Sequence, residues 1–215
     1  MISTRPLVLC LSAVLALVAA HAQTIEHETE RERWQQIAEI FKAMAIGPGN
    51  VVADIGAGDG FLSVRLAPIV GEKGRVYAVD IAEDRLARLR KRVSDAHLEN
   101  LDIVLGSADN PRLPASQLDA VVILNAYHEM PRNDDMLRHI RDSLKPGGRL
   151  VIAEPSPKPG EETRAQQIAK HHISSTFVAE EMARAGFTIL EKRDAYAQLP
   201  GGSGVYSLVV GRRSD

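Results

Sequence analysis

The sequence predicts a single α/β domain built on a doubly wound, mostly parallel sheet. Short apolar runs rich in β-branched residues alternate with helical runs from Val51 onward, as in successive βαβ units. The strand runs are almost continuously apolar, which is typical of strands covered on both faces. A chain of 215 residues with 45% hydrophobic residues is long enough for one sizeable core and short for two.

The elements follow one another with short connections. Turn signals separate them, notably Gly71–Gly74 and Lys145–Gly148. The last two strand runs, Phe187–Lys192 and Gly204–Gly211, are separated by about a dozen residues, a spacing that suits an antiparallel pair closing the sheet edge. The remaining expected strands cover residues 51–55, 75–81, 101–106, 118–125 and 149–154, and the expected helices cover 61–69, 83–96, 133–144 and 174–185.

A polar segment before the first strand, residues 28–44, predicts one amphipathic helix. It could lie across the domain as a lid, or pack as an ordinary surface helix. Its apolar positions recur at helical spacing, and they are Trp34, Ile37, Ile40, Phe41 and Met44.

The N-terminus has the layout of a secretory signal peptide. Arg5 precedes the apolar run Leu7–Ala20, and the small residues of Ala20–Ala22 stand before Gln23. The run is shorter than the roughly 20 residues of a membrane span, although an uncleaved anchor or a buried helix is an alternative. Cleavage would remove Cys10, the only cysteine, and with it any disulfide or thiolate metal site.

We therefore divide the chain into a signal peptide (1–22), an N-terminal helical segment (23–49) and the α/β domain (50–215). A cleaved chain is expected to be exported, either periplasmic or secreted, with no stable membrane span. An uncleaved chain would be membrane-anchored or cytoplasmic. The net charge of -2 gives no general attraction to nucleic acid or anionic membranes.

A glycine-rich turn follows the first strand. Strand 51–55 runs directly into Gly56, Gly58 and Gly60, at the carboxyl end of the sheet where open α/β sheets bind ligands. A dinucleotide-binding turn would read G-x-G-x-x-G, with its last glycine where Phe61 stands. The turn therefore disfavours a dinucleotide, and on its own it could also be a plain tight turn.

The second strand ends in an acid, Asp80, about 20 residues beyond the turn. A carboxylate there can accept hydrogen bonds from both hydroxyls of a ribose. The alternative is a helix N-cap for the run that begins near Glu83.

Several segments together resemble class I S-adenosylmethionine (SAM)-dependent methyltransferases, in the order of that family. The likeness covers roughly Asn50 to Gly211. It implies the Rossmann-like methyltransferase fold, a seven-stranded sheet with an antiparallel last strand. It also implies SAM as cofactor and an unidentified acceptor, by default a small molecule or a lipid-like quinone. The matching segments read ADIGAGDGFLS, VYAVDI, GSADNPRLP, LDAVVILNAYHEM and LKPGGRLVIAEP.

The resemblance also implies residue roles. The turn Gly56–Gly60 would hold the methionine part of SAM, with Asp54 facing its ammonium. Ala108 and Asp109 would meet the adenine, and Asn125 would face the methionine end beside the acceptor. The implied cofactor-binding set is Asp54, Gly56, Gly58, Gly60, Asp80, Ala108, Asp109 and Asn125.

A histidine after the fourth strand is the candidate catalytic group. His128 could take a proton from the acceptor or orient it, or could be a structural loop histidine. His171 and His172 could converge on the same mouth, and Glu154 is a further candidate at the rim. No metal site is expected, because adjacent histidines usually project in different directions.

Two other functions stay open. An NAD(P)-dependent oxidoreductase would share the sheet and Asp80, but Pro131 stands where a Tyr-x-x-x-Lys pair starting at Tyr127 would need its lysine. A non-catalytic SAM-binding module is the third possibility, since SAM is made in the cytosol and the chain carries an export signal. The oligomeric state is left open by the sequence.

Overall fold

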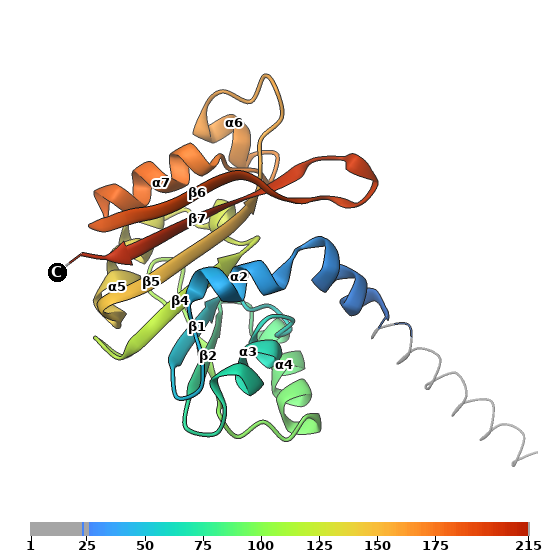
Figure 1. Cartoon of the computed structure of the whole chain (residues 1–215), viewed down its shortest axis with the longest axis vertical. Helices are drawn as coiled ribbons and strands as arrows, with labels where there is room; N and C mark the ends of the chain where they lie inside the picture. The colour runs from blue at the N-terminus through green and yellow to red at the C-terminus, as the bar shows by residue number, and fades with distance from the viewer. Residues whose placement is uncertain (1–22, 24–25, 215) are drawn as a thin grey trace, which may run out of the picture.

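The computed structural model of the chain describes residue 23 and residues 26–214 (Figure 1). The strands are β1 (Val51–Ile55), β2 (Arg75–Asp80), β3 (Leu101–Leu105), β4 (Leu118–Leu124), β5 (Leu144–Pro155), β6 (Phe187–Gln198) and β7 (Val205–Arg213). The helices are α2 (Ile37–Met44), α3 (Ser63–Val70), α4 (Glu83–Asp95), α5 (Asn133–Ser143), α6 (Arg164–Ile168) and α7 (Ser175–Arg184), with short 3₁₀ turns η1 (Tyr127–Glu129) and η2 (Pro200–Gly202).

The strands form one seven-stranded sheet in the order β3-β2-β1-β4-β5-β7-β6. Strands β1 to β5 pair in parallel, and β7 lies antiparallel between β5 and β6. This confirms the predicted doubly wound sheet with its antiparallel last strand. The strand order reverses between β1 and β4, and at such a switch point the carboxyl ends of the strands open a crevice for ligands.

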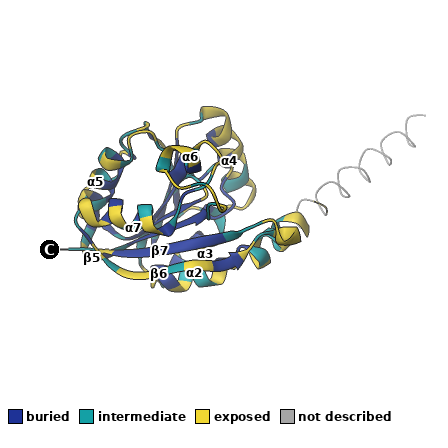
Figure 2. Ribbon diagram, turned by 90° about the horizontal axis from the view of Figure 1, so that it is seen from above, coloured by how far each residue is buried: buried dark blue, intermediate teal, exposed yellow. Residues whose placement is uncertain are grey.

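Helices cover both faces of the sheet, which explains the continuous apolar strand runs. Alternate strand residues enter two cores, because side chains in a strand point to opposite faces. Val52 packs in the core under α2, α3 and α4, whereas its neighbour Ala53 packs in the core under α5 and α7. Figure 2 shows the resulting arrangement, with buried strands between helices that are exposed on their outer faces.

Most elements begin and end within two residues of the predicted bounds. The exceptions are β6, which was expected to end at Lys192 and continues to Gln198, and β5, which was expected from Arg149 and begins at Leu144. Leu144 already pairs with Leu118, and the register then shifts across the Pro146–Gly148 turn before pairing resumes at Arg149. The turn signal therefore marks an irregularity inside the strand, not its start.

The single amphipathic helix predicted before β1 is wrong, because two helical stretches replace it. Residues 26–34 are helical, the chain turns at Gln36 in the left-handed region (φ 48), and α2 follows. Each half packs against a different part of the domain. Arg92 of α4 donates two 2.7 Å hydrogen bonds to the Glu28 carboxylate in the first half, whereas Ile40 of α2 is wholly buried in the core. One straight helix could not make both contacts.

A buried tyrosine fixes the 3₁₀ turn that follows β4. The hydroxyl of Tyr127 donates a 2.7 Å hydrogen bond to Glu181 of α7, which also accepts from Asn133 (2.9 Å) and Arg164 (2.6 Å). Burial, together with the charge of Glu181, raises the pKa of Tyr127, so the hydroxyl keeps its proton and stays a donor. The neighbouring His128 is therefore held on a rigid support.

The predicted signal peptide, residues 1–22 with Cys10, lies outside the described residues. Within the described ranges, no helix is both long enough and apolar enough to cross a membrane.

Candidate functional site

Two adjoining cavities open at the carboxyl ends of the strands, on either side of the switch point. The larger has a volume of about 380 Å³ and the smaller about 140 Å³. Gly56, Arg85 and Asn125 line both, so the two cavities meet at the glycine turn. Together they form one cleft between the ends of β1, β2 and β4.

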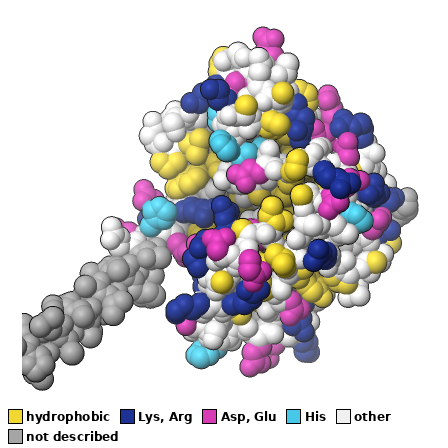
Figure 3. Space-filling view, turned by 180° about the vertical axis from the view of Figure 1, so that it is seen from behind, with side chains coloured by type: hydrophobic (Ala, Val, Ile, Leu, Met, Phe, Trp, Pro, Cys, Tyr) yellow, Lys and Arg dark blue, Asp and Glu magenta, His cyan; other side chains and the backbone are white. Residues whose placement is uncertain are grey.

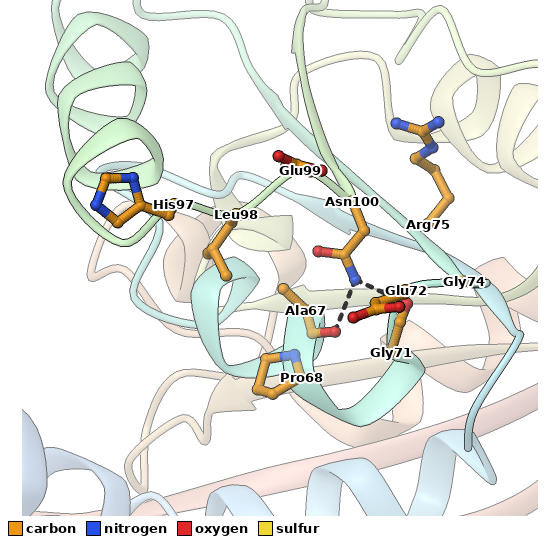
Figure 4. A pocket seen from close by; sticks show the side chains of 10 residues that line it. All are labelled: Ala67, Pro68, Gly71, Glu72, Gly74, Arg75, His97, Leu98, Glu99 and Asn100. Atoms are coloured by element: carbon orange, nitrogen blue, oxygen red, sulfur yellow. Dashed lines mark hydrogen bonds between the residues drawn. The ribbon is translucent and has the colours of Figure 1, made fainter.

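A still larger cavity of about 500 Å³ lies at the opposite edge of the sheet, where α3 ends and β2 and β3 begin (Figure 4). Its central polar group is the amide of Asn100, which donates to the backbone oxygens of Ala67 (2.8 Å) and Gly71 (2.9 Å). These bonds satisfy carbonyls at the end of α3. We assign this cavity a structural role, because ligands of open α/β sheets bind at the carboxyl ends of the strands.

The glycine turn packs too tightly for larger residues at two of its three glycines. A Cβ on Gly56 (φ 77) would lie 2.4 Å from the Ala126 Cβ, and a Cβ on Gly60 (φ 85) would lie 2.2 Å from Leu89 Cδ1. Both also adopt the left-handed backbone region that favours glycine. At Gly58 there is room, since the nearest atom would be 3.9 Å away. The turn thus packs against Ala126 at Gly56 and against Leu89 at Gly60, and leaves Gly58 open to the cleft.

Asp80 holds the glycine turn in place by a hydrogen bond to its backbone. One carboxylate oxygen accepts the N–H of Gly58 at 2.8 Å, and the other accepts the N–H of Ala82 at 2.9 Å. The N-cap position of α4 is Ala82, so Asp80 is not the cap residue. A carboxylate offers about four acceptor positions, and Asp80 lines the larger cavity. It therefore retains capacity to accept hydrogen bonds from a ligand such as a ribose.

Asp54 lies at the inner end of the smaller cavity and is buried. Ser63 donates a 2.6 Å hydrogen bond to its carboxylate. Burial raises the pKa of Asp54 to about 6, and the hydrogen bond from Ser63 and the charge of Arg31 only partly offset it. A cation bound here would stabilise the ionised carboxylate.

Arg31 is a residue of this site that the sequence did not reveal. It comes from the helical stretch 26–34 and lines the smaller cavity with Asp54. Its guanidinium lies 3.9 Å from the centre of the Phe61 ring, and its Nε donates to Gln35 at 2.9 Å. No motif marks Arg31, since its position depends on the turn at Gln36 that breaks the expected helix.

Of the other predicted cofactor residues, Ala108 and Asn125 line the cleft and Asp109 does not. Ala108 lines the larger cavity, and Asn125 lines both. Asn125 adopts a left-handed backbone (φ 55), and its side-chain oxygen accepts from the Tyr206 hydroxyl at 3.0 Å. Asp109 is not among the residues that line either cavity, and Arg132 donates a 2.6 Å hydrogen bond to its carboxylate.

His128 is held by a buried carboxylate. Its Nδ1 lies 2.6 Å from Glu154, whose other oxygen accepts the N–H groups of Ala126 (2.8 Å) and Tyr127 (2.6 Å). Glu154 is therefore not at the rim as expected, being 1% exposed. Burial alone would lower the pKa of His128, but the hydrogen bond and charge of Glu154 outweigh it and raise the pKa. His128 does not itself line the larger cavity, whereas its neighbour Glu129 does.

Of the two adjacent histidines, only one approaches His128. The rings of His171 and His128 lie 5.5 Å apart at an interplanar angle of 87°. His172 turns away, with its Nδ1 2.9 Å from Glu161. The expected convergence thus holds for His171 alone.

Comparison with known sequences identifies a methyltransferase domain over residues 52–148. A ubiquinone/menaquinone biosynthesis C-methyltransferase UbiE of Ectopseudomonas mendocina is 34% identical over 155 residues, which are 72% of this chain and 58% of that protein. A demethylmenaquinone methyltransferase of Listeria monocytogenes is 30% identical over 124 residues, 58% of this chain and 52% of that protein. The chain thus spans little more than half the length of these curated relatives.

Comparison of structures agrees with the sequence comparison. A SAM-dependent methyltransferase from Aquifex aeolicus superposes with a TM-score of 0.71 at 21% identity, over 84% of this chain and 92% of that one. At this identity the likeness establishes the fold. The matched domain, its relatives and the shared fold together show a methyltransferase domain with the Rossmann-like fold of SAM-dependent methyltransferases.

Proposed function

We propose that this chain transfers the methyl group of SAM to a small-molecule acceptor. The observation that carries the proposal is the cleft at the switch point, where the glycine turn and Asp80 meet in one hydrogen-bonded unit. The relatives named for quinone biosynthesis support a quinone-like acceptor.

The larger cavity is the proposed place of the adenosine part of SAM. Asp80 would accept hydrogen bonds from the ribose hydroxyls with the acceptor positions that Gly58 and Ala82 leave free. Ala108 would contact the adenine. Asp109 remains the proposed partner of the adenine amine, and its ion pair with Arg132 holds its carboxylate in place.

The smaller cavity is the proposed place of the methionine end. That end carries both an ammonium and a carboxylate, and the cavity offers one partner of each sign, Asp54 and Arg31. Gly56 and Gly58 would let the backbone approach the ligand, and Asn125 would face it from the end of β4. The charges of this cavity therefore match those of a zwitterion.

SAM supplies an activated methyl group on a positive sulfonium, so methyl transfer mainly needs two partners held in line. An acceptor that loses a proton also needs a base. His128 is the proposed base, with Glu154 holding Nδ1 and so leaving Nε2 to take the proton. Glu129 lines the larger cavity and lies 3.7 Å from His128 Nε2.

We also propose that residues 1–22 are an export signal and that the domain works outside the cytosol. The proposal rests on the residue pattern alone: an arginine, an apolar run and small residues before Gln23.

The test of methyl transfer uses the full chain and methyl-labelled SAM, offered with demethylated quinones, catechols and a small-molecule extract. We expect label in a quinone-like acceptor.

Asp80→Ala should weaken SAM binding by roughly 1.5–3 kcal/mol, or about 10- to 150-fold, because it removes a charged hydrogen-bond partner. Asp95→Ala, an exposed aspartate of α4, is the matched control and should leave affinity unchanged. Tight SAM binding without label in any fraction would instead favour the non-catalytic module.

The place of Arg31 is tested by comparing two ligands by calorimetry. Arg31→Ala should weaken binding of SAM about 10-fold or more, since it removes the cation that would pair with the carboxylate. It should leave binding of methylthioadenosine, which lacks the amino-acid part, within about twofold. Equal losses for both ligands would contradict the assignment.

The raised pKa of Asp54, about 6, makes SAM affinity depend on pH. Below pH 6 the free protein holds a proton on Asp54 that the ammonium must displace, whereas above pH 6 the carboxylate is already ionised. Affinity should therefore fall about tenfold from pH 7 to pH 5. Asp54→Asn should flatten this profile, and methylthioadenosine should show none. An unchanged slope in Asp54→Asn would assign the dependence to another group.

Export is tested by sequencing the N-terminus of the protein recovered from cells. Gln23 as the first residue is the expected result, since signal peptidase cleaves after small residues such as Ala22. Recovery of the chain with Met1 intact would show that it is not processed there.

A further inference from the structure

Three side chains with metal-ligand chemistry converge beside the cleft. The candidate ligand atoms of His128, Glu129 and His171 all lie within 4.8 Å of one another. A Glu129 oxygen lies 3.7 Å from His128 Nε2 and 4.0 Å from His171 Nδ1. Figure 3 shows histidine and acidic side chains side by side near the middle of one face. Imidazole and carboxylate groups are the usual protein ligands of zinc and similar ions.

One of the three ligands is already oriented for a metal. His128 is 2% exposed, and Glu154 holds its Nδ1 at 2.6 Å. Metal-binding histidines usually give one ring N–H to a carboxylate in this way, which fixes the ring and leaves the other nitrogen for the ion. In His128 that other nitrogen is Nε2, the atom that faces Glu129.

The other two ligands are free to close around an ion. The side chains of Glu129 and His171 are 61% and 77% exposed. A tetrahedral ion with ligands at 2.0–2.1 Å needs ligand atoms about 3.4 Å apart. Rotation of the exposed Glu129 and His171 side chains toward His128 can shorten the distances between the ligand atoms to this value. The sheet does not have to move.

The backbone selects His171 over its neighbour. His171 adopts the left-handed region (φ 58), and its ring meets His128 edge to face, while His172 binds Glu161. The hydrogen bond to Glu154 explains the position of His128 but not the approach of a second imidazole.

We propose that His128, Glu129 and His171 bind one divalent transition metal of the zinc class, with an open coordination position toward the larger cavity that Glu129 lines. Three protein ligands and one open position are typical of catalytic zinc sites. An ion on Nε2 occupies the electron pair that would take a proton. His128 therefore acts as a base only in the metal-free protein, and in the loaded protein the ion would polarise an acceptor oxygen instead.

The test is titration of the full chain with Zn²⁺ by calorimetry, without a histidine tag, SAM or acceptor. We expect one site per chain. Glu129→Gln and His171→Ala should each weaken it at least 10-fold, since each loses a ligand. Both positions are exposed, so the variants should keep the fold, which thermal unfolding checks. His172→Ala is the matched control and should bind within twofold of the unaltered chain, because His172 faces Glu161.

Co²⁺ gives a second readout, because its visible absorption reports the ligands around the ion. The spectrum of the loaded chain should change in His171→Ala and stay the same in His172→Ala. Equal Zn²⁺ binding by the unaltered chain and the Glu129→Gln/His171→Ala double variant would overturn the proposal, as would equal loss in His172→Ala. Neither measurement needs SAM, so failure here is distinct from failure of methyl transfer.

Discussion

The buried carboxylate of Glu154 is the interaction on which the candidate site depends. It accepts the N–H groups of Ala126 and Tyr127 with one oxygen and meets the ring of His128 with the other. A carboxylate this deeply buried is stable only when hydrogen bonds replace its water. The bonds that satisfy it also fix the loop after β4, and so they set the wall of the larger cavity and the direction of the histidine together.

The cleft combines parts from distant segments of the chain. The sheet supplies Asp54 and Asp80 at the ends of neighbouring strands, whereas Arg31 arrives from the N-terminal segment. That segment is held at Glu28 by Arg65 and Arg92 and at α2 by the core. A segment that packs on the domain from outside the sheet therefore lines the smaller cavity, and the two opposite charges of this cavity come from distant segments of the chain.

The sheet and the cofactor side of the cleft could be predicted because their causes are local in sequence. Burial on both faces produces continuous apolar strands, and the ends of β1 and β2 place Gly58 and Asp80 side by side. What the sequence did not reveal depends on single backbone angles and distant partners. The left-handed backbone at Gln36 brings Arg31 to the cleft. The left-handed backbone at His171 gives its side chain a different direction from that of His172. The burial of Glu154 follows from packing that no local pattern records.

The contact between Gly56 and Ala126 has a consequence for variation at both positions. No room for a methyl group exists on Gly56, since it would lie 2.4 Å from the Ala126 side chain. The two positions are therefore coupled in one direction: a methyl group on Gly56 would require glycine at position 126, whereas Gly56 has no side chain whose removal could make room for a larger residue in place of Ala126. A redesign of acceptor preference has to begin elsewhere, among the cavity residues that do not touch this pair.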